Sequence, residues 1–364
     1  MSEPQAFEDL LLAIVAPILD ALKVFERSSR YLGPSTMETV RNQLLDTRRG
    51  LRDASANLDE SIWPPAAVPI RDAVSAAYGH ALRSLERLAE ADGSANDLMP
   101  LYRALGARAP MCEAIYPLAQ HFSLVHRFFL DHEKQEVPRL SQASTAEPVG
   151  FSGVHHIAND RKQRGGYSIY VPESFDPARR YPVVFALHGG SGHGSSFLWS
   201  WIRTCRTEEL VLVSPTSVGG TWAIMGEDLD TPNLLQMLES MARLVQIDET
   251  KLLLTGMSDG GTFTYVSGCT ASSPFTHLAP CSASFHPMLI EMMAKDRLRD
   301  LPICITHGAL DWMFTVDIAQ TAEYSFNAAG ANVFYREIAD LAHTYPEDAN
   351  PELVKWFLNT NASG

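Results

Sequence analysis

The stretch "LLLTGMSDGGT", residues 252–262, constrains the fold more than any other part of the sequence. Its leucines predict a buried β-strand, and the glycines at 256, 260 and 261 surround Ser258. Glycine lets a strand turn at once into a helix without a side chain striking its neighbours. The stretch therefore predicts a sharp strand–turn–helix unit that presents a serine hydroxyl beside the free N–H groups of a helix start. A glycine-rich turn with an idle serine is the alternative.

The chain from about residue 151 onward alternates short β-rich runs with helical segments. Several runs are apolar throughout, which is typical of strands buried in a parallel sheet. This alternation predicts an α/β fold, a mainly parallel sheet with helices on both faces. We expect strands at residues 166–171, 182–188, 210–214, 251–256, 302–308 and 332–338.

The first 135 residues follow another pattern, because their apolar residues recur at helical spacing. Four such stripes, separated by breakers such as "YLGPS" and "WPP", predict an all-α helical bundle. We therefore expect a helical domain at 1–135, a linker at 136–150 and a catalytic domain at 151–364. The bundle could act as a cap over the serine, as the surface of a homodimer, or only as a stabilising appendage.

Composition and charge exclude several classes of function. A formal net charge of −14 argues against a nucleic-acid partner. No apolar run is long enough to cross a membrane, and the N-terminus lacks the positive charge of a secretory signal. The five cysteines are irregularly spaced without a CxxC pair, so we expect reduced thiols, no metal site and a cytoplasmic location. A single Cys269–Cys281 disulfide stays open.

A second glycine-rich stretch, "LHGGSG", follows the strand expected at 182–188. The backbone N–H groups of such a loop can approach a substrate oxygen and form an oxyanion hole. We expect the donors to be Gly190 and Asp259, with Ser191 as a further candidate. A phosphate-binding loop is the alternative, but the Lys-Ser/Thr ending of a P-loop and the GxGxxG spacing of a dinucleotide site are both missing. We expect His188 to hydrogen-bond within its own loop.

Two residues beyond later strands complete a candidate constellation. Asp311 follows the strand at 302–308, and His343 follows the strand at 332–338. The order Ser258, Asp311, His343 is the order of nucleophile, acid and base in α/β-hydrolases. Each residue lies just past a strand, where open α/β sheets place their ligands.

Other residues compete for roles in this constellation. Asp317 and Asp340 are alternative acids. His286 follows another predicted strand and is a candidate for lining the substrate pocket. The pair His155 and His156 would point to opposite faces of a strand, which argues against metal binding there.

The motifs "LHGGSG", "GMSDGG", "HGALDWMF" and "AHTYP" together resemble the α/β-hydrolase superfamily over residues 151–360. The resemblance extends more loosely to the branch of polyhydroxybutyrate-depolymerase-like and feruloyl-esterase-like carboxylesterases. It implies serine esterase chemistry without a cofactor, with Ser258 as nucleophile, Asp311 as acid and His343 as base. It also implies that Trp222, in "GGTW", lines the acyl or alcohol site. Trp312, beside the acid, is a second aromatic candidate, and core packing is the alternative for both.

The sequence departs from the secreted polymer depolymerases of that branch. Their signal peptide and disulfides are not evident here, and a long helical N-terminal domain is not usual among them. We therefore expect an intracellular serine carboxylesterase that hydrolyses small soluble carboxylic esters through an acyl-enzyme intermediate. An acyltransferase, a lactonase or a peptidase would use the same three residues, and a non-catalytic binding module is a more remote alternative.

Overall fold

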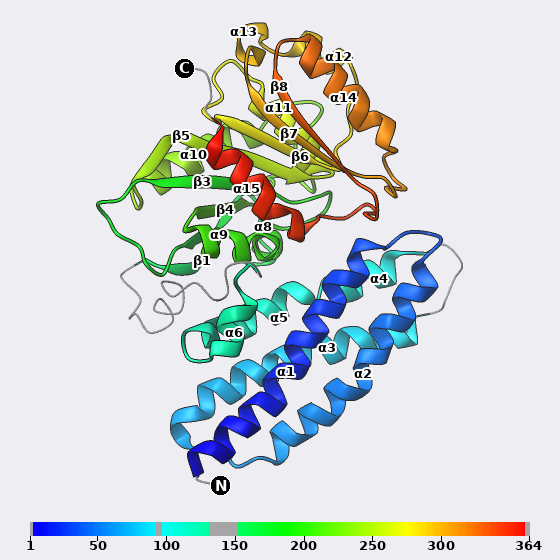
Figure 1. The fold of residues 1–364 in the computed structure, drawn as a ribbon, viewed down its shortest axis with the longest axis vertical. Coiled ribbons are helices and arrows are strands. Elements are labelled where there is room, and N and C mark those ends of the chain that lie inside the picture. Colours follow the sequence, from blue (N-terminus) through cyan, green and yellow to red (C-terminus); the bar gives the residue numbers. More distant parts are fainter. Residues whose placement is uncertain (1–2, 92–96, 132–150, 361–364) are drawn as a thin grey trace. The chain divides into compact units, whose positions relative to one another are not determined.

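The computed structural model describes residues 3–91, 97–131 and 151–360 (Figure 1). The chain divides into two compact units, Met1–Thr145 and Ala146–Gly364, called the N-terminal and C-terminal units below. The linker expected at 136–150 lies outside the described residues. Within the described ranges, no helix is both long and apolar enough to span a bilayer.

The described part of the N-terminal unit is helical, as its apolar stripes predict. Its elements are α1 (Glu3–Arg30), α2 (Met37–Glu60), η1 (Pro65–Ala67), α3 (Val68–Glu90), α4 (Met99–Leu105), α5 (Arg108–Ile115), η2 (Tyr116–Gln120) and α6 (Ser123–Phe128).

The fourth stripe is not a single helix, so the prediction of four helices was wrong in this segment. It is divided between α5, the 3₁₀ turn η2 and α6, and the separate short helix α4 precedes it. Pro117 lies in the first turn of η2, where its missing N–H cannot continue the hydrogen bonding of α5. The apolar residues Met111, Ile115 and Val125 of this stripe are nevertheless fully buried.

The helices of the N-terminal unit enclose their own apolar core. Ile14, Ile18, Leu44 and Leu85 are completely buried. The hydroxyl of Tyr78 in α3 donates to the carbonyl oxygen of Ile14 in α1 at 2.6 Å. This bond satisfies a buried hydroxyl whose pKa is raised by burial. The unit therefore has the packing of a folded domain.

The C-terminal unit is built on one eight-stranded sheet with the order β1-β2-β4-β3-β5-β6-β7-β8. β2 is antiparallel to β1 and β4, and the remaining neighbours are parallel. The strands are β1 (Gly153–Ile157), β2 (Tyr167–Val171), β3 (Tyr181–Leu187), β4 (Val211–Pro215), β5 (Ile247–Met257), β6 (His277–Cys281), β7 (Pro302–Gly308) and β8 (Asn332–Ile338).

Each of the six strands predicted from the sequence coincides with a strand of this sheet. The sequence did not predict β1 and β6. β1 reads "GVHHI" and is only half-buried, so its pattern is not that of a core strand. β6 reads "HLAPC" and is fully buried, but its proline and histidine break the apolar run.

Helices cover both faces of the sheet, as expected (Figure 1). They are α8 (Gly194–Phe197), η4 (Leu198–Ser200), α9 (Ile202–Glu208), α10 (Asp230–Ala242), α11 (Asp259–Gly268), α12 (Met288–Met292), α13 (Lys295–Leu298), α14 (Val316–Ala328), η5 (Glu347–Ala349) and α15 (Asn350–Asn359). Side chains of α10, α11 and α14 join one core cluster. α9 and α15 contact each other, and they pack against β4 and β5 respectively.

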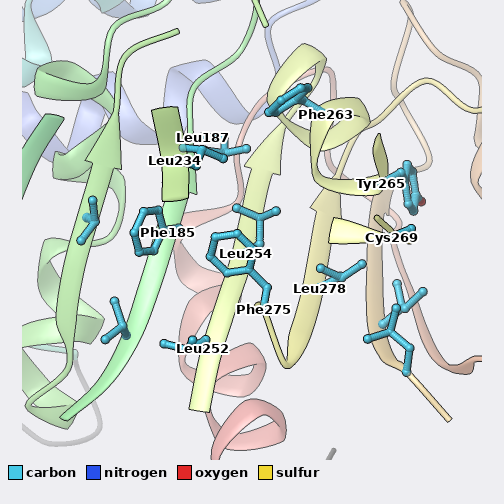
Figure 2. Close-up of a cluster of buried hydrophobic side chains, with 14 of the residues drawn as sticks. Phe185, Leu187, Leu234, Leu252, Leu254, Phe263, Tyr265, Cys269, Phe275 and Leu278 are labelled. Atoms are coloured by element: carbon cyan, nitrogen blue, oxygen red, sulfur yellow. The ribbon is translucent and has the colours of Figure 1, made fainter. Parts of the chain in front are cut away.

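Apolar side chains of the central strands meet those of the helices in a dense core (Figure 2). Phe185 of β3, Leu254 of β5 and Leu278 of β6 lie in this cluster with Phe263 and Tyr265 of α11. Burying one such aliphatic or aromatic side chain contributes about 1.5–3 kcal/mol. The core thus holds the carboxyl ends of the strands, where the polar residues described next are found, in fixed positions.

All five cysteines are buried free thiols, so the bridge left open between Cys269 and Cys281 is absent. Burial raises the pKa of both of these thiols to about 12. Such thiols stay protonated and unreactive at neutral pH.

Candidate active site

Ser258 occupies a strained turn between β5 and α11. β5 ends at Met257 and α11 begins at Asp259, so the serine is the single residue of the turn. Its φ of 57° and ψ of −118° lie in a region of backbone conformation that residues other than glycine rarely adopt. The backbone N–H of Ser258 donates to the carbonyl oxygen of Cys281 at the end of β6, at 2.9 Å. Strand, turn and helix therefore form the unit predicted from the sequence.

Gly256 and Gly260 permit the close packing around this turn. A Cβ atom on Gly256 would lie 2.4 Å from the backbone of Gly260. A Cβ atom on Gly260 would lie 2.4 Å from the carbonyl oxygen of His188, at the end of β3. Real Cβ atoms do not come this close, so the glycines let α11 pack against β5 and β3. This is the role expected of them.

Ser258, His343 and Asp311 are joined in a chain of hydrogen bonds. His343 Nδ1 lies 2.8 Å from Asp311 Oδ2 and 3.0 Å from Oδ1, and His343 Nε2 lies 3.0 Å from Ser258 Oγ. Because a carboxylate only accepts, Nδ1 carries the proton and Nε2 is free to accept from the serine hydroxyl. All three side chains are at least nine-tenths buried.

The carboxylate of Asp311 is held by its own loop as well as by His343. Its Oδ1 accepts from the backbone N–H groups of Met313 at 3.0 Å and Phe314 at 2.9 Å. Burial raises the pKa of Asp311, but the hydrogen bonds from His343 and Phe314 outweigh it, so the pKa lies below its ordinary value. The group is therefore a fixed negative charge beside the imidazole.

The competing acids lie elsewhere. Asp317 is exposed on α14, and Asp340 is exposed on the loop before His343. His307 was not among the residues predicted from the sequence. It is buried, and its Nε2–H donates to the carbonyl oxygen of Phe314 at 2.8 Å. The same nitrogen lies 3.5 Å from Asp311 Oδ2. The signal that could have found it is its position at the end of β7, four residues before the acid.

The three residues expected to form the oxyanion hole lie together beside Ser258. A Cβ atom on Gly190 would lie 2.7 Å from Oδ2 of Asp259, which leaves no room for a side chain there. A Cβ atom on Gly189 would lie 3.6 Å from Cβ of Ser258, an ordinary contact distance. Gly190, Ser191 and Asp259 all line one pocket of about 500 Å³. The loop after β3 thus lies against the start of α11.

His188 and Trp222 fix the base of this loop. His188 Nδ1–H donates to the carbonyl oxygen of Gly189 at 2.6 Å, and Nε2 accepts from the N–H of Ser217 at 3.1 Å. This is the structural role expected of His188, and burial lowers its pKa to about 4. Trp222 Nε1–H donates to the carbonyl oxygen of His188 at 2.7 Å, and its ring stacks on Phe263. Trp222 is only 3% exposed and packs mainly in the core, but it also lines the same pocket as Gly190 and Asp259.

The two remaining candidates differ in their surroundings. The ring of Trp312 lies 6.4 Å from the ring of His343 and is 38% exposed. His286 is exposed on the loop before α12, and its Nδ1 accepts from the N–H of Met288 at 3.2 Å. Trp312 therefore borders the hydrogen-bonded chain, whereas the bond of His286 is local to its own loop.

The paired histidines of β1 have separate partners. The ring of His155 stacks on Phe151, and His156 shares a hydrogen bond of 2.7 Å with Ser168. Across the described ranges, no three His, Cys, Asp or Glu side chains gather in a way that could hold a metal ion.

Sheet order and the serine turn together define the class of this protein. The sheet is mainly parallel, the serine follows β5 on a strained turn, and an acid and a histidine follow β7 and β8. This is the α/β-hydrolase fold. The fold expected from the sequence, an α/β-hydrolase domain after a helical region, is confirmed.

Comparison with known proteins agrees with the esterase resemblance. No protein-family model matches the chain. "Probable feruloyl esterase C" of Aspergillus terreus is 29% identical over 136 residues, which are 35% of this chain and 48% of that protein. A bifunctional acetylxylan esterase/xylanase of Neocallimastix patriciarum is 30% identical over 156 residues, 42% of this chain and 22% of that protein. The chain thus spans half or less of the length of these relatives.

Among the solved structures that are similar to this chain is a ferulic acid esterase, with a TM-score of 0.47. It is 16% identical, and the superposition covers 56% of this chain and 96% of that one.

Proposed function

We propose that this protein is a serine carboxylesterase that hydrolyses small carboxylic esters through an acyl-enzyme. The observation that carries the proposal is the unbroken chain of hydrogen bonds from Ser258 through His343 to Asp311, on a strained serine turn. The local similarity to feruloyl and acetylxylan esterases supports the same chemistry.

In this mechanism Ser258, His343 and Asp311 act as a catalytic triad. Nε2 of His343 takes the serine proton while Ser258 Oγ attacks the ester carbonyl carbon. Asp311 keeps the imidazole in the required tautomer and stabilises the imidazolium that forms. The imidazolium then gives its proton to the departing alkoxide, which leaves the acyl group on Ser258. Water, activated by the same histidine, releases the acid.

The negative oxygen of the tetrahedral intermediate needs donors that are already in position. We assign these to the backbone N–H groups of Asp259 and Gly190, with Ser191 as a third candidate. Support comes from the free N–H groups at the start of α11 and from the close approach of Gly190 to Asp259. A donor of this kind contributes about 3–4 kcal/mol to transition-state stabilisation. The mechanism calls for no metal or organic cofactor.

The direct test uses the Ser258→Ala variant. We expect turnover of p-nitrophenyl acetate to fall by roughly 10⁴-fold or more, with unchanged circular dichroism and unfolding midpoint. A fluorophosphonate probe should label the wild type at Ser258 only. The Ser272→Ala variant, at an exposed position, is the matched control and should keep both turnover and labelling by the probe. Undiminished turnover by Ser258→Ala would refute the proposal.

Acyl transfer, lactone opening and peptide cleavage share the acyl-enzyme step, so they differ only in acceptor or substrate. Product analysis in the presence of competing alcohols and amines separates them. We expect free acid as the main product. A predominance of transferred acyl product would instead assign an acyltransferase.

For location and assembly we propose a cytoplasmic protein that forms a homodimer through its N-terminal helices. Five free thiols are typical of a reducing compartment.

The dimer is supported by a groove of about 320 Å³ lined by Leu11, Leu12, Val15 and Phe122, in which Leu12 is half exposed. The solution mass of the full chain tests it. We expect a dimer for the wild type and a monomer for Leu12→Glu, and a monomeric wild type contradicts it.

A further inference from the structure

A pocket of about 500 Å³ is lined by Asp259, the residue that follows Ser258. Gly190, Ser191 and Asp259 form its inner wall, and residues 218–223 with Met225, Glu227, Leu229 and Asp230 form the rest. Its volume lies within the range of roughly 300–1,000 Å³ that is usual for small-molecule sites. The pocket is therefore large enough for much more than an acetyl group.

Three hydrogen-bonded attachments hold the outer wall of this pocket. Both oxygens of the buried Asp230 carboxylate accept backbone N–H groups, from Val218 at 2.7 Å and from Ala223 at 2.8 Å. Thr221 Oγ1–H donates to Asp259 Oδ2 at 2.5 Å. The bond from Trp222 to His188 is the third. The wall is thus tied to α10, to the start of α11 and to the loop after β3.

The lining combines exposed apolar side chains with carboxylates. Val218 is 39% exposed, Met225 91% and Leu229 52%, although all three are apolar. Exposed apolar side chains gathered around a pocket are typical of ligand sites. Glu227 and Asp259 add two carboxylates to the same lining, in a chain whose net charge is already −14. Such a lining attracts uncharged apolar groups and repels anions.

The proposed mechanism fixes which part of an ester reaches this pocket. The leaving alcohol must lie near His343 Nε2, which protonates it, and Trp312 borders that side. The carbonyl oxygen must point to the N–H groups of Gly190 and Asp259. The acyl chain must therefore extend from the carbonyl carbon in the remaining direction. The pocket lies beside the two donor residues, Gly190 and Asp259, which are part of its lining.

We propose that this pocket binds the acyl part of the substrate and selects an uncharged, apolar acyl group larger than acetyl. It discriminates against acyl groups that carry a free carboxylate. The inference rests on the proposed esterase function and adds the substrate class to it. Met225, Leu229 and Glu227 are the specificity-determining residues.

Size selection is tested with p-nitrophenyl esters of graded acyl length. We expect kcat/KM of the wild type to rise from acetate to hexanoate. Met225→Ala and Leu229→Ala should each lower the hexanoate-to-acetate ratio by roughly three- to tenfold, the scale of one or two lost methylene contacts. Met292→Ala is the matched control, because Met292 is 81% exposed on α12 and does not line this pocket. Its ratio should equal that of the wild type.

Charge selection is tested with the p-nitrophenyl ester of adipic acid, whose second carboxyl is free, and with its uncharged methyl ester. We expect the wild type to prefer the uncharged compound. Glu227→Gln should reduce this preference by roughly threefold or more, and added salt should reduce the wild-type preference in the same direction.

Different results would overturn the esterase proposal and the assignment of the acyl pocket. Absence of both acetate turnover and fluorophosphonate labelling at Ser258 would overturn the esterase proposal itself. Normal turnover and labelling, with ratios that Met225→Ala, Leu229→Ala and Glu227→Gln leave unchanged, would overturn only the assignment of the pocket. A wild type that prefers acetate to hexanoate has the same consequence.

Discussion

Nδ1 of His343 lies 2.8 Å from Oδ2 of Asp311, although 32 positions of sequence separate them. The parallel pairing of β7 with β8 produces this proximity, since each residue follows the carboxyl end of its strand. Ser258 reaches the same edge from β5, and 85 positions separate it from the histidine. The site is thus a product of sheet topology, and each element can be tested by a substitution.

Asp311→Asn should leave the fold intact and lower kcat by roughly 10⁴-fold, because the amide cannot balance the charge of the imidazolium. Steady-state kinetics with p-nitrophenyl acetate provide the measurement, and circular dichroism checks the fold. Asp317→Asn, at an exposed position of α14, is the control and should behave as the wild type. Equal activity of Asp311→Asn and the wild type would remove Asp311 from the mechanism.

Gly260→Ala should destabilise the C-terminal unit by about 3 kcal/mol or more, because the new Cβ would overlap the carbonyl oxygen of His188. Gly50→Ala is the opposite case. Gly50 lies inside α2, and a Cβ there would meet nothing within 4 Å. We expect it to stabilise by about 0.5–1 kcal/mol. Urea unfolding of both variants measures the difference, and a stability loss for Gly50→Ala larger than for Gly260→Ala contradicts the packing described.

Trp222→Phe should preserve most of the core packing but leave the carbonyl oxygen of His188 without its donor. Leaving a buried acceptor unpaired costs about 1–3 kcal/mol. Because His188 begins the loop that carries Gly190, we expect kcat to fall roughly tenfold, which corresponds to about 1.4 kcal/mol, with a smaller change in KM. Trp63→Phe, in the N-terminal unit, loses a similar indole bond and serves as the control. A Trp222→Phe enzyme with wild-type kcat would show that this bond does not position the loop.

Acid should destabilise the C-terminal unit through two buried histidines. Burial lowers the pKa of His188 and of His277 from 6.5 to about 4. Between these values the unfolded chain binds protons that the folded chain excludes, so the free energy of unfolding decreases as the pH falls from 6.5 towards 4. The stability they contribute is fully present above pH 6.5.

Urea unfolding at a series of pH values across this window measures the slope. His277→Gln should make it shallower, because one of the two groups no longer titrates, whereas the exposed His121→Gln should leave it unchanged. An unchanged slope in His277→Gln is the contrary result.

The sequence was sufficient for the features that local chemistry determines. Glycines at 256 and 260 indicated the serine turn, and apolar runs indicated the central strands. The order of Ser258, Asp311 and His343 indicated which side chains would meet, because parallel strands present their carboxyl ends at one edge. The geometry also distinguishes Asp311 from Asp317 and Asp340, which sequence order alone could not do.

Other features depended on contacts that no local pattern encodes. The break between α5 and α6 at Pro117 interrupts an apolar stripe whose residues are buried except for the half-buried Phe122. Trp222 matched a pocket-side motif and does line the pocket, but its ring also packs on Phe263 and its N–H reaches the loop after β3, 34 positions away. The role of Asp230 in holding the loop at 218–223 is likewise visible only once the chain is folded.

The two hydrogen bonds that the Asp230 carboxylate accepts, from Val218 and Ala223, have a kinetic consequence. Since one carboxylate already fixes both ends of the 218–223 segment, an arriving ester does not have to restrict the backbone motion of that segment. Encounter should then proceed without a slow closing step, and the observed association rate should grow linearly with ester concentration instead of reaching a plateau.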